Sequence, residues 1–336
     1  MNIKAIAKLS GYSVATVSRV INQSPKVSET ARKKILAVME EVQYTPNVFA
    51  QGLGLNSMNM VGILCSDVAN PFYGLAVSLI ENSLRRKGYD SLLCCSGTLP
   101  EDKKKCMALL LKKRVDAIVL IGSVFREEQD NDYLFKAAKT LPVFLINALL
   151  EGDNLYCVYC NERDAMMNAV CRLYHAGCRK ILYLNDTASW SWAGMEKLKG
   201  YQIGLEKCGI AYRKELVQTS KNSIEDAKKQ IEQQLMAGSS FDAVLVSEDS
   251  LAIGALKALQ ERGLRLPLIG FNNSILAACT TPTISSIDHN LDRLCPLAVD
   301  LLIQRLHHKQ IPAVTVLPAR LVERETFPLS ISQLPC

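Results

Sequence analysis

The chain has 336 residues, of which 49% are hydrophobic and 21% charged, with a formal net charge of +6 at pH 7, which is ordinary for a globular protein of two or three domains. No apolar run approaches the roughly 20 residues of a transmembrane helix, and residues 1–10 alternate polar and apolar side chains, unlike a signal peptide. The sequence therefore predicts a cytoplasmic protein with no membrane partner.

The first 22 residues predict two short helices joined by a turn. Apolar side chains recur at helical spacing up to Ser10, and Gly11 then supplies the permissive backbone that a tight turn needs. Ser13 follows as the N-cap of the second helix. The apolar residues on the inner face of that helix are Val14, Val17, Val20 and Ile21. This pattern predicts a helix-turn-helix whose second helix fits the major groove of DNA.

A third helix is predicted to begin after its N-cap, Ser28, and to bury one apolar stripe. Residues 1–60 contain seven Lys or Arg and three Glu, so four of the six excess positive charges fall in this segment. Positive charge binds DNA phosphates without regard to sequence. The alternative is the solvated basic face of a small helical bundle, and we favour DNA because turn, helices and charge coincide.

From Met60 onward, buried strands alternate with amphipathic helices. The predicted strands cover 61–65, 91–95, 117–121 and 143–147 in a first set, and 181–184, 243–247 and 268–271 in a second. The predicted helices include 72–87, 101–113, 162–176, 194–208, 223–236 and 250–262. Alternating strands and helices predict mostly parallel sheets covered on both faces, and two successive sets predict two similar lobes.

Twelve cysteines are scattered along the chain, and Cys157 and Cys160 form a CxxC pair. The pair is either a metal or redox site or two core residues of a strand. We favour core residues because no second CxxC and no histidine pair lies at metal-binding spacing.

Several motifs resemble, in their order and spacing, those of the lactose/galactose-repressor family. The sequence of the second helix is similar to that of galactose repressors. The motifs are Gly11–Asn22, Asn70–Tyr73, Lys112–Ala117, Leu198–Tyr201, Ser247–Asp249 with Ala252–Ala255, and Ile269–Phe271. The resemblance implies an α/β fold: an N-terminal helix-turn-helix headpiece and a two-lobed periplasmic-binding-protein-like core with parallel sheets. It also implies that the stretch from Thr283 to Phe327 returns through the first lobe before it ends in the second.

On this resemblance we expect three parts. They are a helix-turn-helix DNA-binding domain at 1–46, a hinge helix or linker at 47–59, and an effector-binding and dimerisation core at 60–330. Within the core, lobe 1 covers about 60–160 and 289–318, and lobe 2 covers about 161–288 and 319–330.

In the headpiece, Arg19 is the best candidate for direct base readout, because a guanidinium binds guanine with two hydrogen bonds. A phosphate contact is its alternative. Short polar side chains on the same helix suit phosphate hydrogen bonds, and Leu53 aligns with the family leucine that wedges into the minor groove. The predicted DNA-contacting residues are Ser13, Val14, Ala15, Thr16, Ser18, Arg19, Asn22, Lys26, Asn47, Ala50, Gln51 and Leu53.

The resemblance also implies a small effector in the cleft between the lobes. Tyr73 lies where relatives stack an aromatic ring on a sugar or purine, and Phe72 either joins it or packs in the core. Trp190 is a further candidate for stacking, with packing as its alternative. The predicted effector-binding residues are Asp67, Phe72, Tyr73, Trp190, Lys197, Glu248, Asp249 and Asn272.

Three of these residues depart from the family pattern: Lys197 replaces an arginine, Glu248 an asparagine and Asn272 an aspartate. An amide offers other donors and acceptors than a carboxylate, and lysine lacks the planar fork of arginine. We therefore expect a ligand that is not held as galactose or lactose is held. The charges favour a neutral or cationic polar ligand over a simple anion.

These features predict a homodimeric transcription repressor that binds a near-palindromic operator and responds to a small effector, a sugar or related metabolite. The alternative is a small-molecule-binding protein whose N-terminal helices dock on a partner other than DNA. The chain contains no GxSxG, P-loop or HExxH motif, so no catalytic residue, cofactor or metal site is predicted.

Overall fold

The computed structural model describes residues 2–22, 24–44, 57–127, 130–186 and 191–327. Contacts along the chain divide it into two units. The first is Met1–Met60 with Arg114–Asp116, and the second is Val61–Lys113 with Ala117–Cys336. Each unit is described by itself below.

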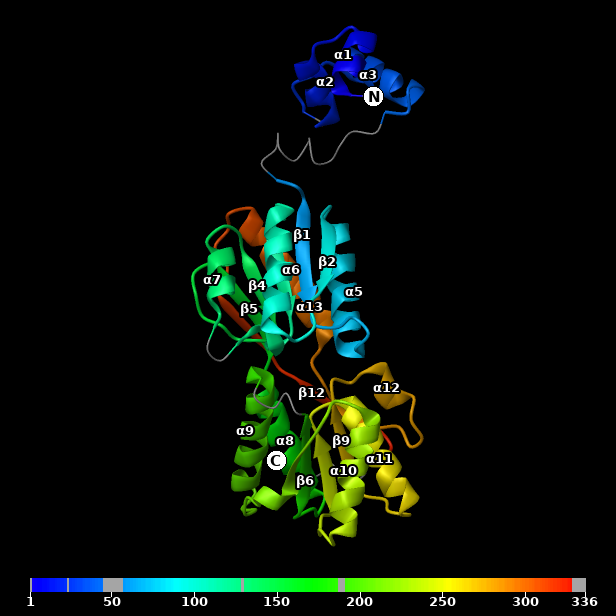
Figure 1. The fold of residues 1–336 in the computed structure, drawn as a ribbon, viewed down its shortest axis with the longest axis vertical. Helices are drawn as coiled ribbons and strands as arrows, with labels where there is room; N and C mark the ends of the chain where they lie inside the picture. The colour runs from blue at the N-terminus through cyan, green and yellow to red at the C-terminus, as the bar shows by residue number, and fades with distance from the viewer. Residues whose placement is uncertain (1, 23, 45–56, 128–129, 187–190, 328–336) are drawn as a thin grey trace. The chain divides into compact units, whose positions relative to one another are not determined.

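The N-terminal unit contains three helices, drawn in blue in Figure 1: α1 (Ile3–Ser10), α2 (Val14–Ile21) and α3 (Glu29–Glu41). Both predicted N-caps are confirmed. The Oγ of Ser13 accepts a hydrogen bond from the Thr16 amide at 3.1 Å, and the Oγ of Ser28 accepts one from the Ala31 amide at 3.3 Å. The predicted turn is confirmed as well, since α1 ends at Gly11 with a φ of 75°.

The core of this headpiece consists of buried apolar side chains from all three helices: Ile6, Ala7, Val17, Val20 and Ile35. Val14 was expected on the inner face of α2, and this part of the prediction is wrong, because Val14 is 41% exposed. It is the first residue of α2 and lies one turn before Val17, where the short helices α1 and α3 do not cover it. Its side chain is therefore available for a contact outside the headpiece.

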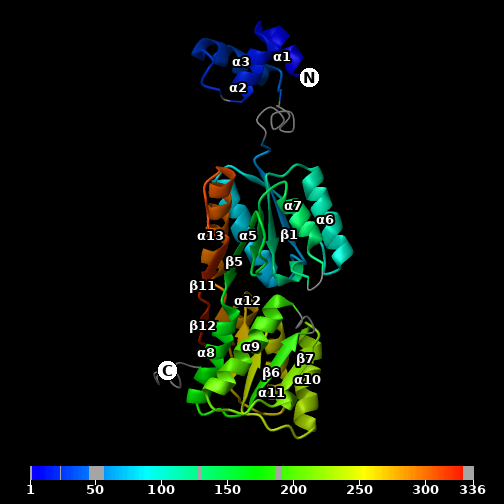
Figure 2. The same cartoon turned by 90° about the vertical axis from the view of Figure 1, so that its left-hand side faces the viewer.

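The second unit begins with a six-stranded sheet in the order β11-β5-β4-β3-β1-β2. Its strands are β1 (Met60–Cys65), β2 (Asp90–Cys95), β3 (Ala117–Ile121), β4 (Val143–Ile146), β5 (Leu155–Cys160) and β11 (Val314–Leu317). The registered pairs are parallel. Figure 2 shows helices on both faces of this sheet, with α5 (Pro71–Arg86) and α13 (Leu291–Leu306) on one side and α6 (Pro100–Lys112) and α7 (Asp132–Ala138) on the other.

A second six-stranded sheet has the order β12-β10-β9-β8-β6-β7. Its strands are β6 (Ile181–Asp186), β7 (Val217–Ser220), β8 (Ala243–Val246), β9 (Leu268–Phe271), β10 (Ser285–Asp288) and β12 (Arg320–Val322). Only the edge strand β12 runs antiparallel among the registered pairs. One core cluster joins the sheet to α8 (Glu162–His175) and α9 (Trp192–Lys207), and another joins it to α10 (Ile224–Met236) and α11 (Asp249–Glu261).

The chain passes between the two sheets three times. It leaves the first sheet after β5, returns after β10 through α13 and β11, and re-enters the second sheet at β12. The expected path of Thr283–Phe327 is therefore the observed one. The last crossing lies beside each of the other two, because Leu317 pairs with Cys160 and the Asn290 Nδ2 donates to the Pro318 carbonyl oxygen at 2.7 Å.

Cys157 and Cys160 are buried in β5, where burial raises the pKa of both thiols. They pack in the core of the first lobe. Within the described ranges, no group of three or more His, Cys, Asp or Glu side chains is placed to hold a metal ion. The same ranges contain no helix with the length and apolar character to cross a membrane.

Candidate functional site

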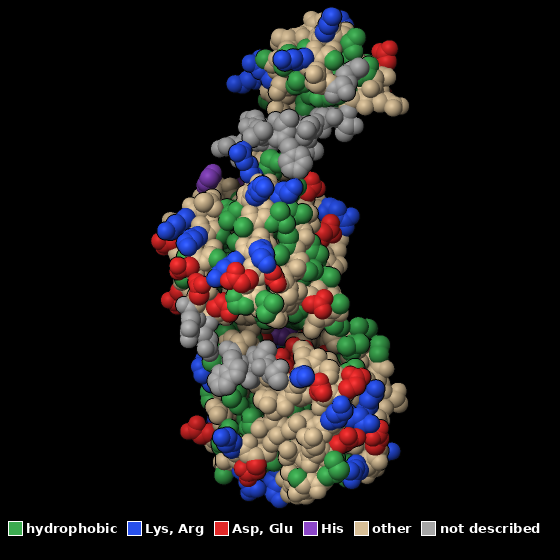
Figure 3. Space-filling model, in the orientation of Figure 1, with side chains coloured by type: hydrophobic (Ala, Val, Ile, Leu, Met, Phe, Trp, Pro, Cys, Tyr) green, Lys and Arg blue, Asp and Glu red, His purple; other side chains and the backbone are tan. Residues whose placement is uncertain are grey.

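The second helix of the headpiece presents a row of short side chains and one long basic one. Ser13, Val14, Ala15 and Arg19 are exposed, Thr16, Ser18 and Asn22 are half-buried, and Lys26 in the following loop is exposed. Figure 3 shows several Lys and Arg side chains on the visible face of the headpiece. Among the described residues Arg19 forms no ion pair, so its guanidinium is available to a partner.

Ser13 and Thr16 contact each other, with their hydroxyl oxygens 2.9 Å apart. These two side chains thus cap the N-terminus of α2, and each hydroxyl can form one more hydrogen bond. The four predicted contacts of the linker, Asn47, Ala50, Gln51 and Leu53, lie outside the described residues.

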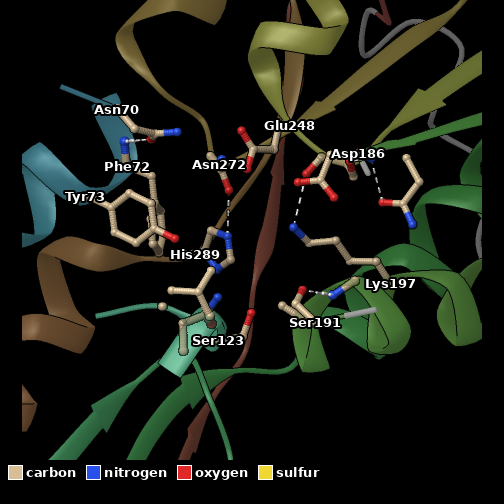
Figure 4. A pocket seen from close by; sticks show the side chains of 17 residues that line it. Asn70, Phe72, Tyr73, Ser123, Asp186, Ser191, Lys197, Glu248, Asn272 and His289 are labelled. Carbon is tan, nitrogen blue, oxygen red and sulfur yellow. Dashed lines mark hydrogen bonds between the residues drawn. The ribbon is translucent and has the colours of Figure 1, made fainter. Parts of the chain in front are cut away.

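A cavity of about 70 Å³ lies between the two lobes of the core (Figure 4). Its lining comes from both sheets and from the crossing after β10, and it consists of Asn70, Phe72, Tyr73, Gly122, Ser123, Val124, Asn147, Asn185, Asp186, Ser191, Ala193, Gly194, Lys197, Ser247, Glu248, Asn272 and His289.

The first lobe contributes an aromatic wall. The side chain of Asn70 caps α5 by accepting a hydrogen bond from the Phe72 amide at 2.9 Å, which turns the first residues of this helix toward the cavity. The ring of Tyr73 lies over Gly122, where a Cβ atom would fall 2.7 Å from the ring. Phe72 is only 9% exposed and also belongs to the core of the lobe, with its ring 5.1 Å from that of His289. Both of its expected roles are therefore compatible with its position.

Lys197 on α9 is the one cation among the described residues of the lining, and it is buried. Its Nζ donates to the Ser247 carbonyl oxygen at 3.1 Å and lies 4.2 Å from the centre of the Phe271 ring. It is also 3.9 Å from the Oε1 of Glu162, which is fully buried at the start of α8. Burial raises the pKa of Glu162, while Lys197 acts in the opposite direction.

A chain of hydrogen bonds continues from Glu162 across the crossing segments. Its Oε1 accepts from the Nδ2 of Asn147 at 2.8 Å and lies 3.6 Å from the Nε2 of His289. The same Nε2 is 2.9 Å from the Oδ1 of Asn272. Burial lowers the pKa of His289 well below its usual value, so the ring is neutral at pH 7. Both neighbours of Nε2 are acceptors, so Nε2 carries the proton and Nδ1 is an acceptor.

Comparison with known proteins shows to which family the chain belongs. Residues 2–47 match the model of the bacterial regulatory proteins of the lacI family, and residues 170–327 match that of the periplasmic binding protein-like domain. An HTH-type transcriptional regulator of Lachnoclostridium phytofermentans is 42% identical over 332 residues, which cover 97% of this chain and 99% of the relative. The chain belongs to the LacI family. It is a DNA-binding transcription regulator.

Two other members of the LacI family extend the comparison. The HTH-type transcriptional regulator GalR of Escherichia coli is 30% identical over 331 residues, covering 96% of this chain and 95% of GalR. The crystal structure of the lac repressor dimer bound to operator and the anti-inducer ONPF matches with a TM-score of 0.87 at 25% identity, covering 98% of this chain and 99% of that one. The expected resemblance is thus confirmed over almost the whole chain.

The structure brings five of the predicted effector-binding residues together in this LacI-family cleft: Phe72, Tyr73, Lys197, Glu248 and Asn272. Two of the predicted residues, Asp67 and Asp249, lie outside the lining of this cavity. Asp67 is exposed and outside the lining, because its Oδ1 accepts from the Ala69 amide at 2.9 Å and closes the turn after β1. Trp190 lies outside the described residues.

Asp249 is the second residue outside the lining. It is buried beneath the cavity wall, and its carboxylate accepts from the Ser274 amide and from the Ser286 hydroxyl, both at 2.6 Å. These bonds tie the start of α11 to the N-cap of α12 (Ile275–Ala278) and to β10, so Asp249 holds the wall without lining the cavity.

Several lining residues were missed: Asn70, Ser123, Asn147, Asn185, Asp186, Ser191, Ser247 and His289. Many of them share one signal. Asn147, Ser247 and His289 directly follow β4, β8 and β10, and Asp186 is the last residue of β6. Ligands of open α/β sheets bind at the carboxyl ends of the strands, so the polar residue after each predicted strand was a candidate.

Proposed function

We propose that this regulator is a homodimeric repressor that binds a near-palindromic operator, and that a small polar effector in the cavity between its lobes changes its affinity for that operator. The observation that carries the effector is the mixed lining of the cavity. A flat aromatic ring from one lobe faces amide, hydroxyl and charged groups from the other, which suits a single sugar ring or a related metabolite.

The proposed contacts divide by lobe. Tyr73 would stack on the ligand from the first lobe, while Lys197, Glu248 and Asn272 would contact its polar groups from the second. Because a bound ligand contacts both lobes at once, it favours one relative orientation of the lobes over the other. A regulator whose operator affinity depends on that orientation then responds to the ligand through a coupling free energy between two sites.

The proposed DNA site is the exposed row on α2, together with the linker. Each headpiece would place α2 in the major groove of one half-site, with Arg19 on a base and Ser13, Thr16, Ser18, Asn22 and Lys26 on the backbone. The lac repressor, which is bound to operator as a dimer in its crystal structure, supports this arrangement by likeness. Because its proposed partner is chromosomal DNA, we also propose that the protein acts in the cytoplasm and performs no catalysis.

A selection experiment tests this function. The full-length protein is incubated with random duplex DNA, and the bound fraction is enriched and sequenced over several rounds. We expect a near-palindromic consensus whose binding weakens in the presence of one class of small polar ligand. Enrichment of no sequence, with weak binding that disappears at physiological salt, would instead support a protein whose N-terminal helices dock on another partner.

A further inference from the structure

The edge of the first sheet at which its strands begin lies at the opposite end of the strands from the cavity. Helices α5, α6, α7 and α13 each lead into a strand at this edge, so the C-termini of all four helices lie there. β1 begins at the same edge, at Met60, directly after the linker that carries the headpiece (Figure 1). These four helix ends therefore form the surface of the core from which the linker extends.

Each of the four helix ends carries Lys or Arg. The last four residues of each helix and the three that follow contain ten Lys or Arg and no Asp or Glu. We call these ten residues the basic edge: Arg85, Arg86, Lys87, Lys112, Lys113, Arg114, Lys136, Lys139, Arg305 and Lys309. Arg305 is half-buried and the other nine are exposed. Lys and Arg side chains lie on the visible part of this edge in Figure 3.

The core itself neutralises only part of this charge. Four acidic residues lie at the first position of a strand of this edge or within the four positions before it, which leaves six positive charges in excess; they are Asp90, Asp116, Glu151 and Asp153. Arg85 pairs with Glu81, and Lys87 pairs with Asp300. The other exposed members of the basic edge form no ion pair with any described residue. Most of the basic edge is therefore available to an anionic partner.

The attraction of positive side chains to the C-terminal end of a helix dipole does not account for the basic edge. The second lobe provides the comparison, because α8, α9, α10 and α11 likewise end where strands of the second sheet begin. The same stretches of these four helices contain three Lys or Arg and two Glu, an excess of one positive charge against ten. The helix ends of the first lobe thus carry far more positive charge than those of the second.

Part of the basic edge is fixed beside the start of β1. The carboxylate of Asp116 accepts hydrogen bonds from the Met58 amide at 3.1 Å and from the Met60 amide at 2.9 Å. Lys112, Lys113 and Arg114 come shortly before Asp116 in the chain, at the end of α6. A linker of residues 45–56 spans at most about 45 Å even when it is fully extended. DNA bound by the headpiece is therefore present at a high effective concentration for this part of the core.

We propose that the basic edge is a second DNA-binding surface of this regulator, and that its lysine and arginine side chains contact backbone phosphates of double-stranded DNA without regard to sequence. Such contacts release counterions from the duplex and so add an affinity that falls with salt concentration. The inference goes beyond the proposed function, in which the headpiece and the linker alone contact the operator. It rests on that function in one respect, because the headpiece is what brings DNA to the core.

The salt dependence of DNA binding by the full-length protein tests the inference. Fluorescence anisotropy is recorded at several salt concentrations with the selected operator and with random duplex DNA of the same length. One variant combines Lys112→Gln with Lys113→Gln. Its control combines Lys207→Gln with Lys214→Gln, which removes two exposed lysines from the second lobe at the edge where β7 begins.

We expect the Lys112→Gln and Lys113→Gln variant to lose at least about threefold in affinity on both DNAs. The slope of log K against log salt is expected to fall by about one for each phosphate contact removed, up to about four in a dimer. The control is expected to keep the affinity and the slope of the wild type. Lys112→Arg with Lys113→Arg keeps both charges and is expected to restore binding, and matched thermal unfolding of all variants shows that they are folded.

The outcomes separate this inference from the proposed function. Equal affinity and slope of the two glutamine variants would overturn the inference, leave the proposed function standing and favour an acidic protein as the partner of this edge. A loss confined to the operator, or a loss that the arginine variant shares, would also overturn it, because phosphate contacts depend on charge and not on sequence. A wild type that binds no DNA at physiological salt would overturn both.

Discussion

The imidazole Nε2 of His289 lies 2.9 Å from the Oδ1 of Asn272, and this contact joins the crossing segment after β10 to the end of β9 (Figure 4). His289 is also packed between two aromatic rings, with Phe72 at 5.1 Å and Phe271 at 5.0 Å. One neutral ring thus connects the aromatic wall of the first lobe with the polar wall of the second. A substitution of His289 therefore alters contacts on both sides of the cavity.

The depressed pKa of His289 predicts a stability that falls on acidification. Below the usual histidine value of 6.5 the unfolded chain takes up a proton that the folded protein does not, so the free energy of unfolding decreases as the pH falls from 6.5 toward the lower folded value. Glu162, Glu248 and Asp249 act in the opposite direction, because their folded pKa values are raised. We therefore expect the difference between the wild type and His289→Gln, followed by urea unfolding at several pH values, to change below pH 6.5. Parallel pH profiles of the two proteins would show that the pKa of His289 is the same in the folded and unfolded states.

Gly122→Ala is expected to disturb effector binding through Tyr73. Its φ is 102°, and an added Cβ would lie 2.7 Å from the tyrosine ring, so the ring must leave its position. We expect weaker effector binding, a stability loss on the order of 1–3 kcal/mol and unchanged DNA binding by the headpiece. Gly177→Ala is a matched control, because Gly177 has a similar φ of 96° and open space around it. Equal loss of effector binding in both variants would exclude a specific role of the ring.

Arg19→Ala is expected to cost about 1–3 kcal/mol of operator affinity and to relax the preference at one base pair per half-site. The reason is that Arg19 is exposed on α2 among short side chains. Fluorescence anisotropy with operator and random DNA measures the effect, and Lys33→Ala, which removes one positive charge from α3, serves as the control. If both variants lose affinity equally on the two DNAs, Arg19 is a phosphate contact.

Leu53→Ala tests the proposed minor-groove wedge. A wedge acts only in the complex with DNA, so the variant is expected to bind operator more weakly and bend it less, while dimerisation and effector affinity stay unchanged. Gly52→Ala is expected to strengthen operator binding by favouring helix in the linker, on the order of 0.5–1 kcal/mol for each hinge. Bending assays on operator fragments measure the effect of Leu53→Ala. Undiminished bending of the operator by this variant would exclude Leu53 as a minor-groove wedge.

Local features of the fold were predictable from the sequence. The caps Ser13 and Ser28 and the turn at Gly11 follow from chemistry within three or four residues, and alternating strands and helices identified the two sheets. The linker cannot be compared, because residues 45–56 are outside the described part.

The cavity was only partly predictable, because its walls depend on contacts between distant segments. Tyr73 and Lys197, which the family resemblance marks, do line the cavity. Asp67 lies outside the lining because its carboxylate closes the turn after β1, and the direction of such a side chain is not apparent from its place in the sequence. His289 was missed because its partners Glu162 and Asn272 lie far from it along the chain, and only the folded crossings bring them together.

The most direct test of the account measures operator affinity of the full-length protein with and without a ligand of the cavity. Fluorescence anisotropy with the selected operator is recorded for the wild type and for Glu248→Gln at several concentrations of the small polar ligand that binds the wild type most tightly. We expect this ligand to lower the operator affinity of the wild type in a saturable way and to have little effect on Glu248→Gln. An operator affinity that stays constant while calorimetry shows the cavity to be filled would contradict this expectation.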